Sequence, residues 1–333
     1  MKINFKITTQ CPANCKCCNE RLENFQKMQK SDKTLKELFE KIEEIFSHFQ
    51  EKYLSITGGE PTLIQSLSKY VKQVSKEGIY VGIDTNGWNI NKEWLKEMES
   101  AGLKYILFSV YSMNELVFEQ LRGSENGQLY LRMKQAWRTL KEYKVNGGNI
   151  EVRIQMVLMK QNYRELPELL KAAIDSKFNT VSTAYYISEN PNGEILMSRE
   201  DINDFKNNVK PEIISIINRM KIGTELKKVN IEKVDSFFCF NNVSEDKIAN
   251  GIYRNKVNCG EHNRIALYPN GDVTPCLGFD YLMDYKYVMN VFNNNEMKKI
   301  VNLEFGDFWL TEHKMCNHCS SGYQVWINLL DSE

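Results

Sequence analysis

The sequence predicts an α/β fold built on a parallel sheet, because strand-like and helix-like segments alternate through its first two thirds. The fourth strand-like segment, 105–110, is almost wholly apolar, which is typical of a strand covered on both faces. Consecutive β-then-α units with right-handed crossovers form either a barrel or an open doubly wound sheet. A helical pattern follows each of the six predicted strands, 3–8, 53–57, 80–85, 105–110, 150–159 and 180–187.

The helices between these strands are predicted from apolar residues that recur every three or four positions. The first, over 35–49, is expected to be capped by Asp32, whose carboxylate can accept bonds from backbone N–H groups. The third, over 92–101, ends at Gly102, the residue type that most readily takes the left-handed conformation after a helix. The others are expected at 63–76, 114–121, 129–143, 163–176 and 199–220.

The regular pattern ends after residue 220. Residues 221–258 show no clear periodicity, so we expect them to form a connecting segment. A small α+β domain is expected over 259–333, beginning with a β-hairpin, because Asn270-Gly271 is a strong two-residue turn signal. Its predicted elements are strands at 264–268 and 273–275, a short helix near 296–302 and an amphipathic stretch at 322–330.

Charge and cysteine content exclude several classes of protein. The 333 residues include 43 Lys and Arg and 43 Asp and Glu, so the formal net charge is zero, which argues against nucleic acid or an anionic membrane as a partner. No apolar run approaches the roughly 18 residues of a membrane helix, and the N-terminus resembles a strand rather than a signal peptide, so we expect a cytoplasmic protein. The nine cysteines are then poor candidates for disulfides, and their clustering indicates metal.

The first cysteine group directly follows the first predicted strand. Cys11, Cys15 and Cys18 have the spacing C-x3-C-x2-C. Three thiolates on one loop can hold three irons of a cubane cluster and leave the fourth iron open to a ligand. A zinc knuckle or reactive loop thiols are the alternatives, but structural zinc prefers four ligands and Cys17 is wrongly spaced to be the fourth.

Glycines and polar side chains follow the next three strands at the point where each strand ends. Parallel strands build sites at their carboxyl ends, so these groups are expected to share a site. Paired glycines let a backbone approach a ligand closely, and a following carboxylate can bind an amino group. The groups are Gly58, Gly59, Glu60 and Pro61 after the second strand, Thr85 and Asn86 after the third, and Ser109 in the fourth.

Together these motifs resemble the radical S-adenosylmethionine (SAM) superfamily over residues 1–220. The cysteine triad matches the ligands of that family's [4Fe–4S] cluster, and Gly58 to Pro61 match the motif that binds the methionine amino group of SAM. Thr85, Asn86, Ser109 and Asn162 match positions near the cofactor, and Arg122-Gly123 resembles an Arg-Gly pair of the fourth unit. Cys17 departs from the family, which usually has an aromatic residue there.

The resemblance implies a partial (β/α)6 barrel and a specific chemistry. An electron from the reduced cluster cleaves SAM, and the resulting 5′-deoxyadenosyl radical abstracts a hydrogen atom from the substrate. The family therefore also implies an electron donor such as flavodoxin or ferredoxin.

The second cysteine group comprises Cys259, Cys276, Cys316 and Cys319. On spacing alone, four thiolates with one close pair fit either a zinc ribbon or a closed iron–sulfur cluster. Behind this barrel, the pattern resembles the Twitch and SPASM auxiliary-cluster domains, which implies one fully ligated auxiliary [4Fe–4S] cluster. Met289-Asn290-Val291 is similar to a Gly-Asn-hydrophobic step of those domains, with Met in place of Gly.

Three functions are left open by the sequence. The resemblance favours modification of a ribosomally made peptide by crosslinking, thioether formation or epimerisation, with Cys239 as a candidate hydrogen donor in the last case. The alternative is two-electron oxidation of a small polar metabolite such as an aminocyclitol or sugar, because the single-cluster pattern also resembles such dehydrogenases. A zinc-ribbon binding module on a degenerate barrel is the alternative from another class.

Overall fold

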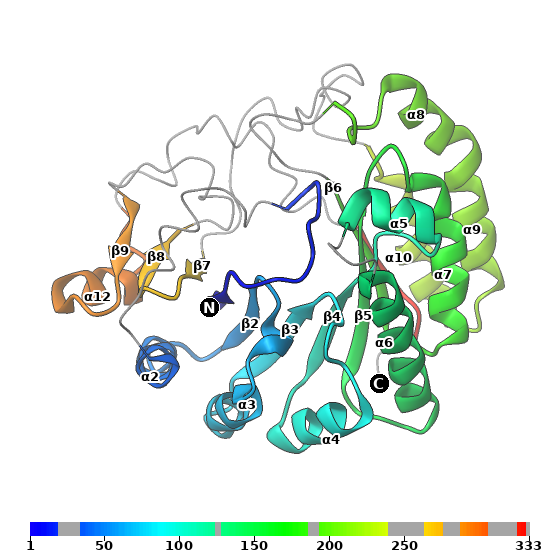
Figure 1. Cartoon of the computed structure of the whole chain (residues 1–333). Coiled ribbons are helices and arrows are strands. Elements are labelled where there is room, and N and C mark those ends of the chain that lie inside the picture. Colours follow the sequence, from blue (N-terminus) through cyan, green and yellow to red (C-terminus); the bar gives the residue numbers. More distant parts are fainter. Residues whose placement is uncertain are drawn as a thin grey trace. The chain divides into compact units, whose positions relative to one another are not determined.

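The computed structural model describes residues 1–18, 34–123, 128–185, 193–238, 263–275, 287–305 and 325–330. The chain divides into two compact units, whose helices and strands are labelled in Figure 1. Within the described residues, the first unit takes Met1–Pro12, Cys18–Ile106 and Asn258–His313, and the second takes Ala13–Cys17, Leu107–Val257 and Lys314–Glu333. The cysteine loop, residues 11–18, therefore contributes to both units.

The first unit is built on strands in the order β3-β2-β1-β7-β8-β9. β1 pairs in parallel with β2 on one edge and with β7 on the other, and β2 pairs in parallel with β3. The predicted hairpin is present as the antiparallel pair β7 and β8, and Gly271 takes the left-handed conformation in its turn (φ 87°). The bounds are β1 Lys2–Thr8, β2 Tyr53–Gly58, β3 Tyr80–Thr85, β7 Arg264–Leu267, β8 Asp272–Thr274 and β9 Met289–Asn290.

The helices of the first unit differ from the expectation at two starts. Thr34 rather than Asp32 caps α2: its hydroxyl accepts from the N–H of Glu37 at 3.2 Å, and the Glu37 carboxylate accepts from the N–H of Thr34 at 2.7 Å. Asp32 lies outside the described residues. The helix expected over 63–76 begins later, at Leu67, and a separate 3₁₀ turn, η2, precedes it. The bounds are α2 Leu35–Phe46, η2 Pro61–Leu63, α3 Leu67–Lys76, α4 Lys92–Ala101 and α12 Asn294–Val301.

Aromatic side chains of these helices pack against the sheet of the first unit. Phe5 of β1 meets Phe39 of α2 edge-on at 5.4 Å between ring centroids, and Phe39 stacks on Tyr70 of α3 at 4.6 Å. Phe5 and Phe39 are fully buried. Aromatic pairs of this kind contribute about 0.5–1.5 kcal/mol beyond their buried area, so β1, which leads into the cysteine loop, is firmly held.

In the second unit the strand order is β10-β6-β5, with β5 and β6 parallel and β10 antiparallel to β6. β5 buries every second residue, Val152, Ile154, Met156 and Leu158, as expected for a strand that has one face in the core. β4, Tyr105–Ser109, contains the point at which the chain passes between the units. The remaining bounds are β5 Glu151–Leu158, β6 Thr180–Tyr185 and β10 Val325–Asn328.

Two helical features of the second unit differ from the prediction. The helix expected over 199–220 contains a π turn, η4, which accommodates Pro211, since a proline cannot donate to the carbonyl four residues before it. Part of the expected connecting segment is the helix α10. The bounds are α5 Glu115–Arg122, α6 Gln128–Val145, η3 Tyr163–Glu165, α7 Leu166–Asp175, α8 Arg199–Asp204, η4 Phe205–Val209, α9 Lys210–Arg219 and α10 Thr224–Asp235.

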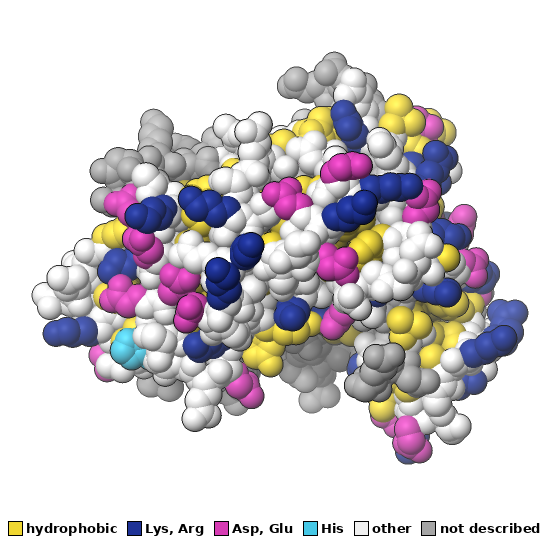
Figure 2. Space-filling model, turned by 90° about the horizontal axis from the view of Figure 1, so that it is seen from below, with side chains coloured by type: hydrophobic (Ala, Val, Ile, Leu, Met, Phe, Trp, Pro, Cys, Tyr) yellow, Lys and Arg dark blue, Asp and Glu magenta, His cyan; other side chains and the backbone are white. Residues whose placement is uncertain are grey.

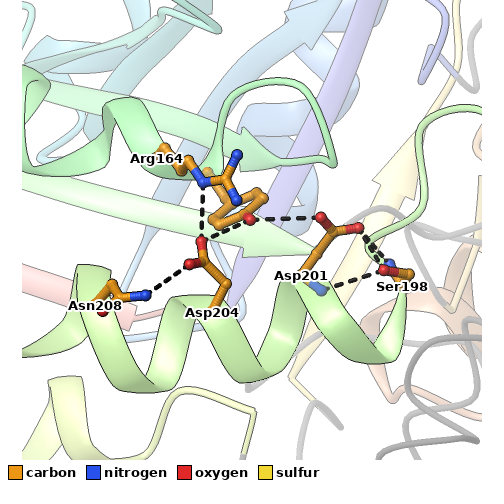
Figure 3. A network of polar contacts seen from close by, with 6 residues as sticks. Arg164, Ser198, Asp201, Asp204 and Asn208 are labelled. Carbon is orange, nitrogen blue, oxygen red and sulfur yellow. Dashed lines mark hydrogen bonds and ion pairs between the residues drawn. The ribbon is translucent and has the colours of Figure 1, made fainter.

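Figure 3 shows a polar network that ties α8 and η4 to η3. Asp204 accepts hydrogen bonds from the Tyr163 hydroxyl at 2.8 Å, Arg164 Nε at 2.9 Å and Asn208 Nδ2 at 2.7 Å. One turn earlier, Ser198 and Asp201 form a reciprocal cap at the start of α8. The network therefore fixes the beginning of the helix that carries the π turn.

Asp204 should make the stability of the chain depend on pH at the acid end. Hydrogen bonds from Asn208, Tyr163 and Arg164 lower the pKa of Asp204 to about 2, from an ordinary value of 3.8. A carboxyl group whose pKa is lower in the folded chain adds stability at pH values above its pKa in the unfolded chain. This stability is lost as the pH falls through its pKa in the folded chain. We therefore expect Asp204→Asn to lower the free energy of unfolding of the metal-free chain at pH 6, and the difference to shrink below about pH 4.

Urea unfolding at a series of pH values checks this expectation. The exposed Glu200, in the first turn of the same helix, provides the matched control as Glu200→Gln. A difference between wild type and Asp204→Asn that is equal at every pH would contradict a role for the ionised carboxylate.

On the face that Figure 2 presents, the basic and acidic side chains of the described residues lie intermingled. Among the described residues, no helix has both the length and the apolar character that crossing a bilayer requires.

Candidate functional site: the cysteine loop and the strand ends beside it

In the first unit, the Gly-Gly-Glu segment lies directly against the chain that leads into Cys11. The N–H of Gly59 donates to the carbonyl of Thr8 at 2.5 Å, and the N–H of Glu60 donates to the carbonyl of Gln10 at 2.8 Å. A Cβ on Gly58 would lie 2.4 Å from the Thr8 oxygen, and a Cβ on Gly59 would lie 2.2 Å from the Gln10 oxygen. The paired glycines therefore allow two backbone segments of this chain to meet.

The Glu60 side chain is fully buried and accepts four hydrogen bonds. Its Oε1 accepts from the Thr62 N–H at 3.0 Å, the Thr62 hydroxyl at 2.6 Å and the Thr85 hydroxyl at 2.6 Å. Its Oε2 accepts from the Asn86 N–H at 2.7 Å. The carboxylate therefore joins the end of β2 to the end of β3.

Burial raises the pKa of Glu60, and the hydrogen bonds from Thr62, Thr85 and Asn86 oppose this effect. No lysine, arginine or histidine of the described residues forms an ion pair with this carboxylate. A buried carboxylate is stabilised by a cationic partner, so Glu60 is suited to receive one.

Asn86 connects Glu60 with the cysteine loop. Its Nδ2 lies 3.5 Å from the Cys11 sulfur, and its Oδ1 accepts from the N–H of Trp88 at 3.0 Å. Thr85 accepts from the N–H of Gly87 at 2.9 Å while it donates to Glu60. Asn86 is 3% exposed and Cys11 is exposed, so an amide directed by β3 reaches an accessible thiol.

In the second unit, the cysteine loop completes the C-terminal end of α5. The N–H of Asn14 donates to the carbonyls of Arg122 and Gly123, both at 2.9 Å, and the N–H of Lys16 donates to the carbonyl of Leu121 at 2.9 Å. The last carbonyls of a helix have no partner within the helix, so the loop satisfies two such groups, those of Leu121 and Arg122, together with the carbonyl of the capping Gly123. The backbone on both sides of Cys15 is fixed in this way.

Two side chains of the second unit contact cysteine sulfurs. Arg122 is 5% exposed, and its Nε lies 3.2 Å from the Sγ of Cys15, which is buried. The sulfur of Cys17, also buried, lies 3.3 Å from the hydroxyl of Tyr111. Arg122 stacks over the Tyr111 ring at 4.4 Å from the centroid. Sequence reasoning did not find Tyr111, because it belongs to no motif and only the fold brings it to Cys17. Thr62 was also missed, although its place two residues after Glu60, where Glu60 caps η2, is a local signal that could have found it.

Ser109 and Asn162 lie at strand ends of the second unit. The carbonyl of Ser109 accepts from Arg122 Nη1 at 2.7 Å. Asn162 is fully buried, and its amide binds backbone groups: Nδ2 donates to the carbonyls of Tyr111 at 2.8 Å and Val157 at 2.9 Å, and Oδ1 accepts from the N–H of Met159 at 2.8 Å. Asn162 therefore holds the segment after β4 against the end of β5.

The remaining predicted residues are placed as follows. Pro61 opens the turn η2, and Cys18 is half-buried. Among the described residues, no three His, Cys, Asp or Glu side chains are grouped so that they could hold a metal ion. Asn290, in the predicted Gly-Asn-like step, binds the hairpin turn through the Asn270 carbonyl at 3.1 Å and Asp272 at 2.8 Å. Five predicted site residues lie outside the described residues: Cys239, Cys259, Cys276, Cys316 and Cys319.

Comparison with known protein families gives one match over half of the chain. The family model of the radical SAM superfamily matches residues 5–173. An S-adenosylmethionine-dependent nucleotide dehydratase of Flammeovirga pacifica is 25% identical over 213 residues, which cover 62% of this chain and 71% of the relative. A tungsten-containing aldehyde ferredoxin oxidoreductase cofactor-modifying protein of Pyrococcus furiosus is 20% identical over 322 residues, covering 92% of this chain and 80% of the relative.

Solved structures show the same fold at low identity. SuiB of Streptococcus suis bound to its precursor peptide SuiA has a TM-score of 0.62 at 18% identity; the match covers 92% of this chain and 65% of SuiB. The enzyme anSMEcpe with bound AdoMet and the Cp18Cys peptide has a TM-score of 0.58 at 17% identity, covering 97% of this chain and 86% of that one. The chain therefore belongs to the radical SAM superfamily, has its parallel-rich α/β fold, and is an enzyme that uses SAM and a [4Fe–4S] cluster.

Proposed function

We propose that this enzyme holds its SAM-binding [4Fe–4S] cluster through Cys11, Cys15 and Cys18 and binds SAM beside Glu60. The donor set fits, because thiolates are the usual ligands of iron–sulfur clusters and three of them leave one iron free for another ligand. The single observation that carries the SAM assignment is the buried carboxylate of Glu60, which has four hydrogen bonds but no cationic partner among the described residues.

The ammonium group of SAM would give the Glu60 carboxylate the cationic partner that it lacks among the described residues. Oε2 accepts one hydrogen bond within the chain and Oε1 accepts three, so Oε2 has more capacity for a further donor. Asn86 binds both this oxygen and the Cys11 thiol, so it would keep the carboxylate and that ligand at a fixed separation. When bound, SAM and the reduced cluster supply the one-electron chemistry that removes a hydrogen atom from a substrate.

The substrate we propose is a peptide, and the reaction is crosslinking, thioether formation or epimerisation. Support comes from the two peptide-bound neighbours, SuiB and anSMEcpe, whose folds match 92% and 97% of this chain, well beyond residues 5–173. Cys259, Cys276, Cys316 and Cys319 would hold one auxiliary [4Fe–4S] cluster, and Cys239 would donate hydrogen if the reaction is an epimerisation. The second candidate, a small polar metabolite, is favoured by the likeness to a nucleotide dehydratase.

Metal analysis after anaerobic reconstitution tests the cofactor assignment. We expect about eight irons and eight sulfides per chain in wild type, and about four of each in a Cys316→Ala/Cys319→Ala variant or in a Cys11→Ala/Cys15→Ala variant. A wild-type content of about four irons and one zinc per chain would indicate a zinc site in place of the proposed auxiliary cluster. If the Cys11→Ala/Cys15→Ala variant binds as much iron as wild type, the proposed site of the SAM-binding cluster is overturned.

Mass spectrometry tests the substrate class. The reconstituted enzyme is incubated with SAM, dithionite and either synthetic peptides from short reading frames beside its gene or a panel of sugars, aminocyclitols and nucleotides. A peptide that loses two hydrogens, or that takes up deuterium from D₂O at one α-carbon, supports a peptide substrate. Oxidation of a small molecule with no change in any peptide would favour the second candidate.

A further inference from the structure

The cysteine loop is held by two side chains that neither the family match nor the cysteine spacing assigns to this task. Arg122, the last residue of α5, is buried and directs its guanidinium at three neighbours (α5 in Figure 1). Nε lies 3.2 Å from Cys15 Sγ, Nη1 donates to the Ser109 carbonyl at 2.7 Å, and the plane lies 4.4 Å from the Tyr111 ring centroid. The guanidinium is a planar fork whose separate nitrogens reach two acceptors in fixed directions, whereas the donors of a lysine all lie on one rotatable ammonium.

Tyr111 extends this arrangement to the next cysteine. Its hydroxyl lies 3.3 Å from Cys17 Sγ, while its ring supports Arg122. Cys17 stands where the family usually has an aromatic residue, so here the aromatic ring beside the loop comes from the segment after β4. Asn162 fixes that segment, because its amide binds the Tyr111 carbonyl at 2.8 Å.

These contacts place a cationic group beside the Cys15 sulfur and a phenol hydroxyl beside the Cys17 sulfur. A cluster gains one negative charge on reduction, and its potential depends on net charge and on hydrogen bonds to its sulfurs. A buried guanidinium beside a ligand sulfur favours the reduced state, because it is attracted more strongly to the more negative cluster.

We propose that Arg122 is a positioning residue for Cys15, which orients the sulfur of this ligand and makes the cluster bound there easier to reduce, and that Tyr111 holds the adjoining Cys17. The proposal rests on the assignment of Cys15 as a cluster ligand. The iron count of the Cys11→Ala/Cys15→Ala variant tests that assignment separately.

The first experiment measures the reduced-to-oxidised ratio of the SAM-binding cluster by EPR at one fixed solution potential, in the reconstituted full chain without SAM. The Cys316→Ala/Cys319→Ala background removes any signal from the second cysteine group. Arg122→Met is expected to lower the ratio about tenfold, equivalent to ~59 mV for a one-electron couple, and Arg122→Lys is expected to recover more than half of this shift. Because SAM is omitted, the change reports the surroundings of the cluster rather than SAM binding.

Lys16→Met is the matched control. Lys16 belongs to the same loop and carries the same charge, but its Nζ lies 3.5 Å from Glu194 and the side chain is 36% exposed. Solvent screens such a charge, so its removal is expected to change the ratio less than about threefold. Equal shifts in Lys16→Met and Arg122→Met, or no shift in Arg122→Met, would overturn the proposed effect on reduction.

The second experiment needs no cluster and shows whether the contacts position the thiols. The metal-free full chain is labelled briefly with iodoacetamide, and fragment ions separate Cys11 from Cys15 in the tryptic peptide 7–16. Arg122→Met and Arg122→Lys are both expected to raise the labelling of Cys15 several-fold relative to Cys11, since each loses the Nε contact. Tyr111→Phe is expected to do the same for Cys17. Labelling that stays at the wild-type ratio in all three variants would overturn the positioning role, even where a variant fails to bind iron.

Discussion

Gly59→Ala is expected to prevent assembly of the SAM-binding cluster. A Cβ at this position would lie 2.2 Å from the Gln10 carbonyl oxygen and 2.6 Å from the Thr9 carbonyl carbon, so one of the two backbone segments must move. The displaced segment, 8–10, leads directly into Cys11, and its hydrogen bonds to Gly59 and Glu60 would break together. Overpacking of this kind costs about 1–3 kcal/mol, and the cost here falls on backbone that cannot rotate away.

Iron analysis and urea unfolding measure the two consequences. We expect reconstituted Gly59→Ala to retain about four irons, those of the proposed auxiliary cluster, and the metal-free chain to lose about 1–3 kcal/mol of unfolding free energy. Gly193→Ala is the control, because a Cβ there would meet no atom of the described residues within 4 Å. It should change stability by less than about 0.5 kcal/mol. Full iron loading in Gly59→Ala would show that the close approach of the two segments is not needed for the cluster.

Glu60→Ala is expected to have the second large effect, on both the fold and SAM binding. Truncation leaves the N–H groups of Thr62 and Asn86 and the hydroxyl of Thr85 without their acceptor in a buried site. Each unsatisfied buried donor costs about 1–3 kcal/mol, so we expect at least about 3 kcal/mol of destabilisation for the metal-free chain. The isosteric Glu60→Gln keeps an acceptor oxygen and should lose less stability.

The two Glu60 variants should differ far less in SAM binding than in stability. Both remove the negative charge, and a hydrogen bond to a charged group is worth about 1.5–3 kcal/mol, so the affinity for SAM should fall about 10- to 100-fold in each. Equilibrium dialysis with the reconstituted proteins measures this loss. Wild-type affinity in Glu60→Gln would mean that the carboxylate is structural only.

The pH dependence of stability gives an independent check on the state of Glu60. Burial raises its pKa above the ordinary 4.5, so the unfolded chain ionises this group more readily than the folded chain. Its contribution to stability is therefore fully present below about pH 4.5 and is lost as the pH rises through the folded pKa. Glu60→Gln should remove this part of the pH profile, which is opposite in sign to the loss expected at Asp204.

Local patterns predicted the elements that their own residues determine. β2 and β3 were placed within one residue, because short β-favouring runs between turn residues have few alternative structures. The helix α10 was missed because its twelve residues are mostly polar; its docking depends on the buried Asn230, which exchanges hydrogen bonds with the backbone of Asn328 at 2.8 and 3.1 Å. Such a bond joins residues that are 98 positions apart, beyond any local pattern.

The same distinction applies to the candidate site. Motif spacing predicted Cys11, Cys15 and Cys18 as one group of ligands, and it predicted Glu60 as a cofactor-binding residue just after the end of a strand. It could not show that Glu60 accepts bonds from two strand ends at once, or that Tyr111 reaches Cys17, since both depend on side-chain directions that the fold sets. The paired glycines were predicted to let a ligand approach closely; the sequence alone did not show that they also let the chain's own residues 8–10 approach.

The pairing of β1 with β7 has a consequence for how the protein folds during synthesis. Lys2 to Phe5 are in parallel register with Arg264 to Leu267, so one edge of the first strand gains its partner only after about 260 further residues have been made. Until then that edge, with Ile3 and Phe5 among its residues, is available to other chains. Contacts of such long sequence separation form slowly, so production at low temperature or with a chaperone should raise the soluble yield.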